Sequence, residues 1–329
     1  MLNKIDVGII GTGSFLPERI ITNKEMESIV DTTDEWIRTR TGIEERRVAD
    51  SDQAASDLGV EAARKALASA GVSADDIDLI IVATLTPDYT FPSTACVVQE
   101  RLGAGKAAAF DLSAACSGFI YGVATGAQFI ASGLYRYVLV IGSETITKIL
   151  NWEDRATCVL FGDGAGACVL SAVDQGKGFK SFVLGSDGGG GHLLSQPASG
   201  SKYPISIDAI NNRHNTLHMS GNEVFKFAVR TIGQASLEAL DKAGMTIDDI
   251  DYFIPHQANI RIIEPAMERM GIPANKAFLN LHKYGNMSSA SIPVALDEAI
   301  KQGVLQPGMT ILLVGFGAGL TWGATVITL

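Results

Sequence analysis

The sequence lacks the features that mark several common classes of protein. None of its four cysteines stands in a Cys-x-x-Cys pair, so we expect reduced thiols rather than a disulfide framework. No apolar run approaches the roughly 20 residues that cross a bilayer, so no membrane segment is expected. Residues 1–7 lack the basic and apolar regions of a signal peptide, which predicts a cytoplasmic protein.

Positive charge is scarce as well. Charged residues make up 19% of the chain, and the net charge is −10. A general nucleic-acid-binding protein needs a basic footprint, so that class is excluded, and an acidic partner would have to meet a local basic patch. What is present is 47% hydrophobic residues and 35 glycines in 329 residues. This composition is typical of a compact globular protein with two domains or one large α/β unit.

Two glycine motifs are incomplete. Gly11 and Gly13 predict a strand that runs into a glycine turn, but the third glycine of a dinucleotide-binding motif would fall at Leu16. Residues 163–166 predict a second glycine turn, which lacks the Lys-Ser/Thr of a phosphate-binding loop. Neither motif indicates a nucleotide site. Residues 186–220 are rich in Gly, Ser, Asn and His, and a connection of that length usually forms the wall or lid of a site.

The chain contains an internal duplication. Residues 65–80 align without gaps to residues 238–253 at an offset of 173, with 8 of 16 positions identical. The same offset carries the apolar run 138–142 onto 311–315. A repeat of about 170 residues is far longer than a solenoid period, so we expect two similar halves, 1–178 and 179–329. Each half alternates strand and helix as βαβαβ, which predicts parallel strands with right-handed crossovers.

Small residues recur on two predicted helices. Gly118, Gly122 and Gly126 are spaced every four residues on one of them. The corresponding helix of the second half carries a similar face of small residues, namely Ser288, Ser291 and Ala295. Such faces let helix backbones approach closely. We therefore expect two central helices packed between two sheets.

Cys116 lies where a predicted strand, 107–110, gives way to a predicted helix, 119–130. Backbone N–H groups at a helix start are unpaired and the helix dipole favours an anion, so the thiol is expected to ionise more easily than in water. A thiolate there would be a nucleophile. The alternative is that Cys116 is a small buried hydrophobic residue, as most free cysteines are.

Further candidate residues follow other predicted elements. His256 follows the repeat of the strand at 79–83, and Asn286 precedes the second central helix. Taken separately, each has a structural alternative, a buried histidine or a turn residue. Because the strand ends of a duplicated fold converge, we expect both side chains near Cys116. Trp36, with Arg38 and Arg40, could stack on a base and pair with phosphate, or could be a partly exposed helix end.

Several motifs together resemble one known family along the whole chain. The segments are Asp-Leu-Ser-Ala-Ala-Cys-Ser-Gly-Phe (111–119), Pro-His-Gln-Ala-Asn (255–259) and Tyr-Gly-Asn-Met-Ser-Ser-Ala-Ser (284–291). They resemble β-ketoacyl-[acyl-carrier-protein] synthase III, a thiolase-fold condensing enzyme. The resemblance implies an α/β fold layered α-β-α-β-α. It also implies an initiating reaction of fatty acid synthesis, in which a short acyl-CoA and malonyl-acyl carrier protein give 3-oxoacyl-carrier protein, CO2 and CoA, with no cofactor and no metal.

The resemblance also implies the roles of individual residues. Cys116 would carry the acyl group, His256 and Asn286 would serve decarboxylation, and the backbone N–H groups of Cys116 and Ala318 would form the oxyanion hole. Phe91 would reach the acyl pocket of the other subunit in a homodimer. Acyl carrier protein would dock on Lys226 and Arg261, with Arg230 sharing the face of Lys226. Acyl-CoA would be bound by residues along a tunnel: Thr32, Trp36, Arg40, Arg155, Gly221, Asn222, Ala258 and Asn259.

The sequence departs from the family pattern at two positions. Met287 stands where threonine is usual, and Ala318 interrupts a run of three glycines, so both are expected to crowd the site and affect the choice of starter. Three rival interpretations remain: a relative of secondary, polyketide-like metabolism, a papain-like cysteine hydrolase, and a non-catalytic thiolase-fold binding protein. The papain-like surroundings of the cysteine are absent, and a duplication has no place in that fold.

Overall fold

Two β-sheets form the framework of the protein in a computed structural model that describes residues 5–329. The expectation of no signal peptide at residues 1–7 therefore lies largely outside the described residues. The first sheet has the strand order β1-β7-β6-β4-β5 and the second β11-β12-β13-β8. The strand bounds are β1 (Val7–Phe15), β4 (Leu79–Ala83), β5 (Ala108–Leu112), β6 (Val138–Glu144), β7 (Gly164–Ala172), β8 (Gly178–Ser186), β11 (Tyr252–Pro255), β12 (Thr310–Gly317) and β13 (Thr321–Thr328).

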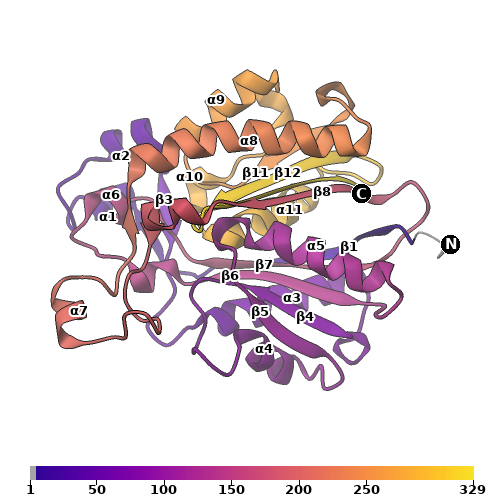
Figure 1. Cartoon of the computed structure of the whole chain (residues 1–329), viewed down its shortest axis with the longest axis horizontal. Helices are drawn as coiled ribbons and strands as arrows, with labels where there is room; N and C mark the ends of the chain where they lie inside the picture. Colours follow the sequence, from indigo (N-terminus) through magenta and orange to yellow (C-terminus); the bar gives the residue numbers. More distant parts are fainter. Residues whose placement is uncertain (1–4) are drawn as a thin grey trace.

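Helices cover both sheets and fill the space between them (Figure 1). Helices α3 (Ala55–Ala70) and α4 (Thr94–Leu102) pack on the outer face of the first sheet. Helices α8 (Gly221–Ala243) and α9 (Ile260–Met270) cover the second sheet. Between the sheets lie α5 (Gly118–Ala131) and α11 (Ser291–Lys301). The predicted α-β-α-β-α layering is confirmed, and the central strands β4, β6 and β12 are buried along their whole length.

The remaining elements are short and lie in the connections. Two small β-ribbons pair β2 (Ile20–Thr22) with β3 (Glu45–Arg47) and β9 (Leu194–Ser195) with β10 (His218–Met219). The short helices are α1 (Asn23–Met26), α2 (Asp34–Thr41), α6 (Arg155–Cys158), α7 (Ile207–Asn211) and α10 (Leu281–Tyr284). Within residues 5–329, no helix combines the length and the apolar character needed to cross a membrane.

The duplication is visible in matching local structure. Helices α3 and α8 end at Gly71 and Gly244, both in the left-handed region with φ of 65° and 68°. Glycine adopts this conformation without steric cost, so it ends the helix cleanly. In each half a 3₁₀ turn and a buried strand follow, β4 in the first and β11 in the second. The internal repeat in the sequence thus corresponds to a repeated unit of helix, glycine cap and strand.

The prediction of purely parallel strands is wrong for one strand in each sheet. β7 runs antiparallel to its neighbours β1 and β6, and β13 runs antiparallel to β12 and β8. The remaining pairs, β4 with β5, β4 with β6 and β11 with β12, are parallel as predicted. The reason is that no packed crossover helix separates β12 from β13, which a short turn connects, and only a 3₁₀ turn at Ile146–Ile149 and the four-residue α6 lie between β6 and β7.

The two predicted glycine turns are also corrected. Gly11 and Gly13 lie inside β1, and Gly164 and Gly166 lie inside β7. A Cβ at Gly13 would come within 2.4 Å of the Ala62 carbonyl oxygen, so this glycine lets β1 approach α3 closely. These glycines bring layers together rather than turn the chain.

The two central helices lie between the sheets as predicted, but the glycine face of α5 does not meet the other helix. A Cβ at Gly122 would come within 2.8 Å of Val140, and one at Gly126 within 2.9 Å of Val138, both on β6. Of the three predicted positions, Gly118 alone approaches the second half, near Ser289. The small residues therefore let α5 sit close to its own sheet.

Each half contains one sharp turn before its central helix. Ala115 and Ser288 occupy corresponding positions and have φ of 49° and 47°, a rare conformation for residues with a Cβ. Cys116 and Ser289 follow them and are therefore counterparts. Cys116 lies against β12 beside Gly315, whereas Ser289 lies against β6 beside Gly142. We call these two segments, 114–117 and 287–290, the Cys116 turn and the Ser289 turn.

Candidate active site

The Cys116 turn places the thiol at the end of β5 and the start of α5, as the sequence predicts. Its backbone packs tightly on β12, because a Cβ at Gly317 would come within 2.6 Å of the Cys116 nitrogen. Strand β12 can thus approach the turn only where glycine stands. Cys116 itself is buried, with 6% of its surface exposed.

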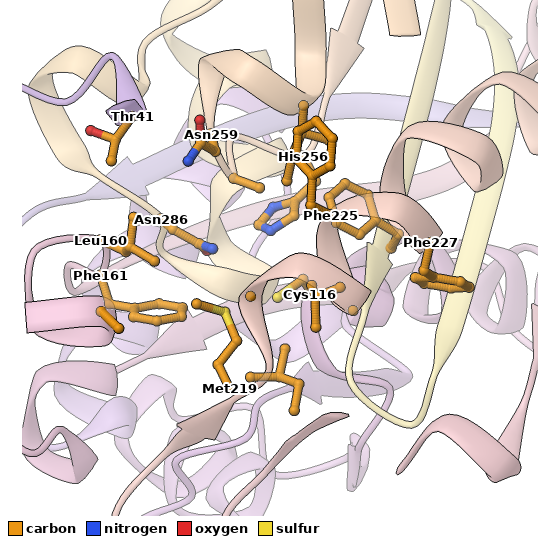
Figure 2. Close-up of a pocket in the computed structure, with 18 of the residues that line it drawn as sticks. Thr41, Cys116, Leu160, Phe161, Met219, Phe225, Phe227, His256, Asn259 and Asn286 are labelled. Atoms are coloured by element: carbon orange, nitrogen blue, oxygen red, sulfur yellow. The ribbon is translucent and has the colours of Figure 1, made fainter. Parts of the chain in front are cut away.

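A cavity of about 320 Å³ brings together the three residues that the sequence singles out. Cys116, His256 and Asn286 all line it: Cys116 from the Cys116 turn, His256 from the position just after β11, and Asn286 from the position just before the Ser289 turn. Figure 2 shows the imidazole of His256 and the amide of Asn286 directed toward the sulfur of Cys116. The expected convergence of the strand ends is therefore confirmed for these side chains.

His256 is neutral because it is buried. Only 1% of its surface is exposed, and burial lowers its pKa to about 3. Its backbone N–H donates to the Val314 carbonyl at 2.7 Å, and its ring meets that of Phe316 edge-on at 5.4 Å between centroids. These contacts fix the position of the imidazole. A neutral imidazole can donate one N–H to an oxygen in the cavity.

Asn286 is held so that its amide N–H₂ is available. Its backbone N–H donates to the Leu160 carbonyl at 2.8 Å, and Gly162 N–H donates to its carbonyl at 3.0 Å. Its side-chain Oδ1 accepts from the backbone N–H of Ser288 at 2.9 Å. Because the oxygen is engaged, the nitrogen is the end that faces Cys116 (Figure 2). Asn286 thus presents a donor to the cavity.

The expectation that Cys116 ionises easily is wrong. Burial raises the pKa of the thiol to about 12, and the nearby Glu144 carboxyl acts in the same direction. The Ser288 hydroxyl opposes this shift. The cost of removing the thiolate from water outweighs its stabilisation by the start of the helix. Both Cys116 and His256 are therefore uncharged at neutral pH.

The mouth of the cavity contains five of the eight residues expected to bind CoA, namely Trp36, Arg40, Gly221, Ala258 and Asn259. Thr33 caps α2 through the N–H of Trp36 at 3.1 Å, and Asn259 caps α9 through the N–H of Arg261 at 2.9 Å. Thr32, Asn222 and Arg155 do not line the cavity.

Arg155 lies directly on the ring of Trp36. The guanidinium carbon is 4.8 Å from the ring centroid, and Nη1 donates to the Asp31 carbonyl at 2.9 Å. Cation and ring therefore attract each other without a ligand between them. A base can stack on this face of Trp36 only after Arg155 moves.

A smaller apolar cavity of about 190 Å³ adjoins the first. It is lined by Leu85, Ile149, Leu217 and Ala318, and it shares Leu194 with the larger cavity. Ala318 is not among the non-glycine residues that have positive φ in the described chain, so its Cβ causes no backbone strain. The predicted wall at 186–220 is confirmed, because this segment supplies Leu194 and Leu217 here.

The expectation that Met287 crowds the site is wrong. Its side chain is fully buried in a separate cluster with Ala290 and Val294, next to Leu16 and Tyr284. It lines neither of the two cavities. Met287, the first residue of the Ser289 turn, therefore does not crowd the cavity at Cys116.

Four residues predicted to contact partners lie on the surface. Phe91, between β4 and α4, is 83% exposed and lines neither cavity. Lys226 and Arg230 are exposed on α8, and Arg261 is exposed on the first turn of α9. Helices α8 and α9 pack against each other beside the cavity mouth.

Sequence reasoning missed most of the apolar cavity wall. The additional lining residues include Thr41, Phe161, Met219, Phe225, Phe227 and Phe316. Met219 falls in the segment predicted as a wall, so its location could have been found. Phe161 and Phe227 belong to no motif, and their side chains reach the cavity only through the packing of distant elements.

The duplicated layered fold, with Cys, His and Asn in one cavity, defines a condensing enzyme of the thiolase fold. The family 3-oxoacyl-[acyl-carrier-protein] synthase III matches residues 110–188, and its C-terminal region matches residues 240–329. A β-ketoacyl-[acyl-carrier-protein] synthase III of Desulfitobacterium hafniense (strain Y51) is 57% identical over 323 residues, 98% of each chain. The chain belongs to the β-ketoacyl-[acyl-carrier-protein] synthase III family.

Solved structures agree with this assignment. The 3-oxoacyl-[acyl-carrier-protein] synthase III of Aquifex aeolicus VF5 superimposes with a TM-score of 0.91 at 46% identity, covering 98% of this chain and 100% of that chain. The priming β-ketosynthase of the R1128 polyketide pathway superimposes with a TM-score of 0.93 at 38% identity, covering 100% and 98%. The fold is thus shared with a polyketide enzyme, while the curated relatives are synthases III.

Proposed function

We propose that this protein condenses a short-chain acyl-CoA, acetyl or branched, with malonyl-acyl carrier protein to give 3-oxoacyl-carrier protein, CO2 and CoA, the initiating step of fatty acid synthesis. The observation that carries the proposal is the single cavity that joins a cysteine thiol to two neutral donors, the His256 imidazole and the Asn286 amide. A cytoplasmic location and the division into halves 1–178 and 179–329 remain predictions from the sequence.

The first step is acyl transfer to Cys116. The sulfur attacks the thioester carbonyl of acyl-CoA, the C–S bond to CoA breaks, and the proton lost by the thiol is balanced by the proton that CoA gains on leaving as a thiol. Because burial raises the pKa of Cys116 to about 12, the thiol loses its proton as the attack proceeds rather than beforehand. The product is an acyl thioester on Cys116.

The second step is decarboxylation of the malonyl group. The bond to the carboxylate breaks, CO2 leaves, and the electron pair moves into the thioester, whose oxygen becomes an enolate. His256 and Asn286 would donate N–H groups to this oxygen. Since burial keeps the imidazole neutral, it stabilises the enolate as a hydrogen-bond donor and does not protonate it outright.

The third step forms the carbon–carbon bond. The enolate carbon attacks the acyl carbonyl on Cys116, and the oxyanion that develops would meet the backbone N–H groups of Cys116 and Ala318. Collapse of this intermediate breaks the bond between the carbonyl carbon and the Cys116 sulfur and releases the 3-oxoacyl product. The Cys116 thiolate then takes up a proton from solvent, which restores the thiol. Loss of one such donor typically costs about 3–4 kcal/mol of transition-state stabilisation.

The CoA moiety would enter through the mouth of the larger cavity. Trp36 and Arg155 would hold the adenine, with Arg155 leaving its present position on the ring. Arg40, Gly221, Ala258 and Asn259 line this cavity and would contact the pantetheine arm or the CoA phosphates, and Thr32 and Asn222, which do not line it, would contact CoA outside the cavity. This arrangement would position the thioester at Cys116.

The smaller apolar cavity is the natural place for the acyl chain, because most of its wall is aliphatic, with Ser195 and Gln196 as the polar exceptions, and because it contains Ala318. A homodimer would complete it. Strand β5 lies at the edge of the first sheet, and an unpaired edge can add a strand from a second copy. Phe91, 83% exposed on the loop before α4, would then reach the acyl cavity of the partner subunit.

Half-reactions test the proposal. Intact-protein mass spectrometry after incubation with acetyl-CoA should show one acetyl adduct, which Cys116→Ala abolishes. His256→Ala and Asn286→Ala should keep acylation and lose most of the condensation with malonyl-carrier protein. Equal loss of both half-reactions in these two variants would contradict the assigned roles. Absence of 3-oxoacyl product with acetyl, isobutyryl and longer starters would overturn the function itself.

A further inference from the structure

Glu144 is a fully buried carboxyl beside the active site that none of the steps above uses. It ends β6 and has 0% of its surface exposed. Among the described residues no Lys, Arg or His pairs with it. An unpaired buried carboxylate is costly, so the group must be stabilised in another form.

One carboxyl oxygen of Glu144, Oε2, acts only as a hydrogen-bond acceptor. Oε2 accepts from the Leu85 backbone N–H at 3.0 Å and from the Thr86 hydroxyl at 2.9 Å. The Thr84 hydroxyl lies at 3.4 Å from the same atom. This oxygen is therefore satisfied as a carbonyl oxygen would be.

The other oxygen, Oε1, faces the Ser289 turn, where a single hydroxyl lies between two acceptors if Glu144 is ionised. The Ser289 backbone N–H donates to Oε1 at 3.4 Å. Ser289 Oγ lies 2.8 Å from Oε1 and 2.7 Å from the Ala83 carbonyl oxygen. One hydroxyl has one proton, so it cannot donate to both acceptors. If Oε1 carries a proton, it donates to Ser289, and Ser289 donates to Ala83. Every close contact then contains a hydrogen.

We propose that Glu144 is a positioning residue that acts in its protonated form, and that its bond to Ser289 holds the Ser289 turn so that the Asn286 amide faces Cys116. This inference rests on the proposed function. The turn connects the two groups directly, because Asn286 Oδ1 accepts from Ser288 N–H, one residue before Ser289. Burial raises the pKa of Glu144, in agreement with a neutral group.

The duplication explains why a buried carboxyl supports the Ser289 turn and not the Cys116 turn. The counterparts of Cys116 and His256 are Ser289 and Ala83, and the counterpart of Glu144 is Gly317. At the Cys116 turn, Gly317 has no side chain and leaves the thiol open to the cavity. At the Ser289 turn, Glu144 and the Ala83 carbonyl enclose the serine. The Ser289 turn is thereby fixed in place and positions Asn286.

A neutral Glu144 also suits the chemistry beside it. An ionised carboxylate at this position contributes to the raised pKa of Cys116 and would oppose the negative charge of the enolate. The Ser288 hydroxyl lies near enough to affect the pKa of both Cys116 and Glu144, although it forms no hydrogen bond of ordinary geometry in the described chain.

The decisive variant is Glu144→Gln, whose amide reproduces the acceptor and donor of a protonated carboxyl. We expect Glu144→Gln to keep condensation within about threefold of wild type, whereas Glu144→Ala and Ser289→Ala lose about tenfold or more while Cys116 acylation changes less. Infrared difference spectra at neutral pH should show a carboxylic-acid band that Glu144→Gln removes. Glu298→Gln is the control, because hydrogen bonds from Lys283 and Asn280 lower the pKa of that half-buried carboxyl, so its replacement should leave the acid band unchanged.

Two results would overturn the proposal. One is an unchanged acid band in Glu144→Gln; the other is a loss of condensation in Glu144→Gln as large as in Glu144→Ala. If Glu144→Ala fails to fold, the activity of Glu144→Gln and the infrared band still test whether Glu144 is protonated. Failure of the wild type to form 3-oxoacyl product would count against the proposed function, and the band would still report the protonation of Glu144.

Discussion

At the scale of single residues, the site consists of groups that are uncharged before substrate binds. Burial moves the pKa values of Cys116 and His256 in opposite directions, to about 12 and about 3. The same desolvation explains both shifts, since it disfavours the thiolate and the imidazolium alike. A site of this kind develops negative charge only during the reaction, where its donors can stabilise it.

The pKa of Cys116 predicts the pH dependence of its reactivity. If thiolate is the reacting form and the pKa is about 12, alkylation of Cys116 by iodoacetamide should rise about tenfold per pH unit from pH 7 to 9, without levelling off. Peptide-level mass spectrometry separates this site from the exposed Cys96, which serves as the internal control. A plateau below pH 8 would show that the start of α5 stabilises the thiolate more than burial opposes it.

At the scale of secondary-structure elements, the sequence predicted the layers better than the contacts between them. Repeated spacing and apolar runs were enough for the central helices, the duplicated strands and the location of Cys116, His256 and Asn286. The direction of β7 and β13 could not be predicted, because connection geometry rather than strand composition decides it. Gly13 was assigned to a turn and Gly122 to a contact with the other central helix, and both assignments were wrong, since a glycine in a sequence does not reveal which group approaches it.

The same limit applies within the site. Three motifs were sufficient to find Cys116, His256 and Asn286. The apolar wall was not found, because Phe161 and Phe227 come from elements distant in sequence and have no local pattern. Glu144 was missed for a different reason: its burial and its partners, Ser289 and Thr86, depend on the packing of the two halves.

The contact between α2 and α6 gives a prediction about substrate affinity. Trp36→Ala should raise the KM for acetyl-CoA about tenfold with little change in kcat, because it removes a stacking surface used before the chemistry. Arg155→Ala should have a smaller effect, because it also removes the guanidinium that the base must displace. The control substrate is acetyl-pantetheine, which has no adenine. An equal loss with both substrates would place Trp36 outside the adenine site.

At the scale of the whole molecule, the net charge of −10 restricts where an acidic carrier protein can bind. The exposed residues Lys226 and Arg230 on α8 and Arg261 on α9 place positive charge at one part of the surface. Lys226→Glu and Arg261→Glu should each raise the KM for malonyl-carrier protein about tenfold and leave that for acetyl-CoA unchanged. Lys242→Glu, on the last turn of α8 and paired with Glu238, is the matched control.

Ionic strength provides a second readout of the same surface. Added salt should weaken the binding of the carrier protein to the wild type, and the two charge-reversal variants should respond less steeply, because exposed charges are screened within a few ångströms at high salt. If salt has the same effect on wild type and variants, the carrier protein docks elsewhere.

The shared middle layer has a consequence for folding. One hydrophobic cluster contains Ile81 and Val140 of the first sheet, Phe119 of α5, Ile292 of α11 and Leu313 of the second sheet. Helix α11 belongs to the second half by sequence but packs on β1 and β7 of the first. Neither half can complete its interior alone, so the chain should denature as one cooperative unit. Scanning calorimetry should give a single transition, and a fragment of residues 1–178 should aggregate or remain unfolded instead of behaving as an autonomous domain.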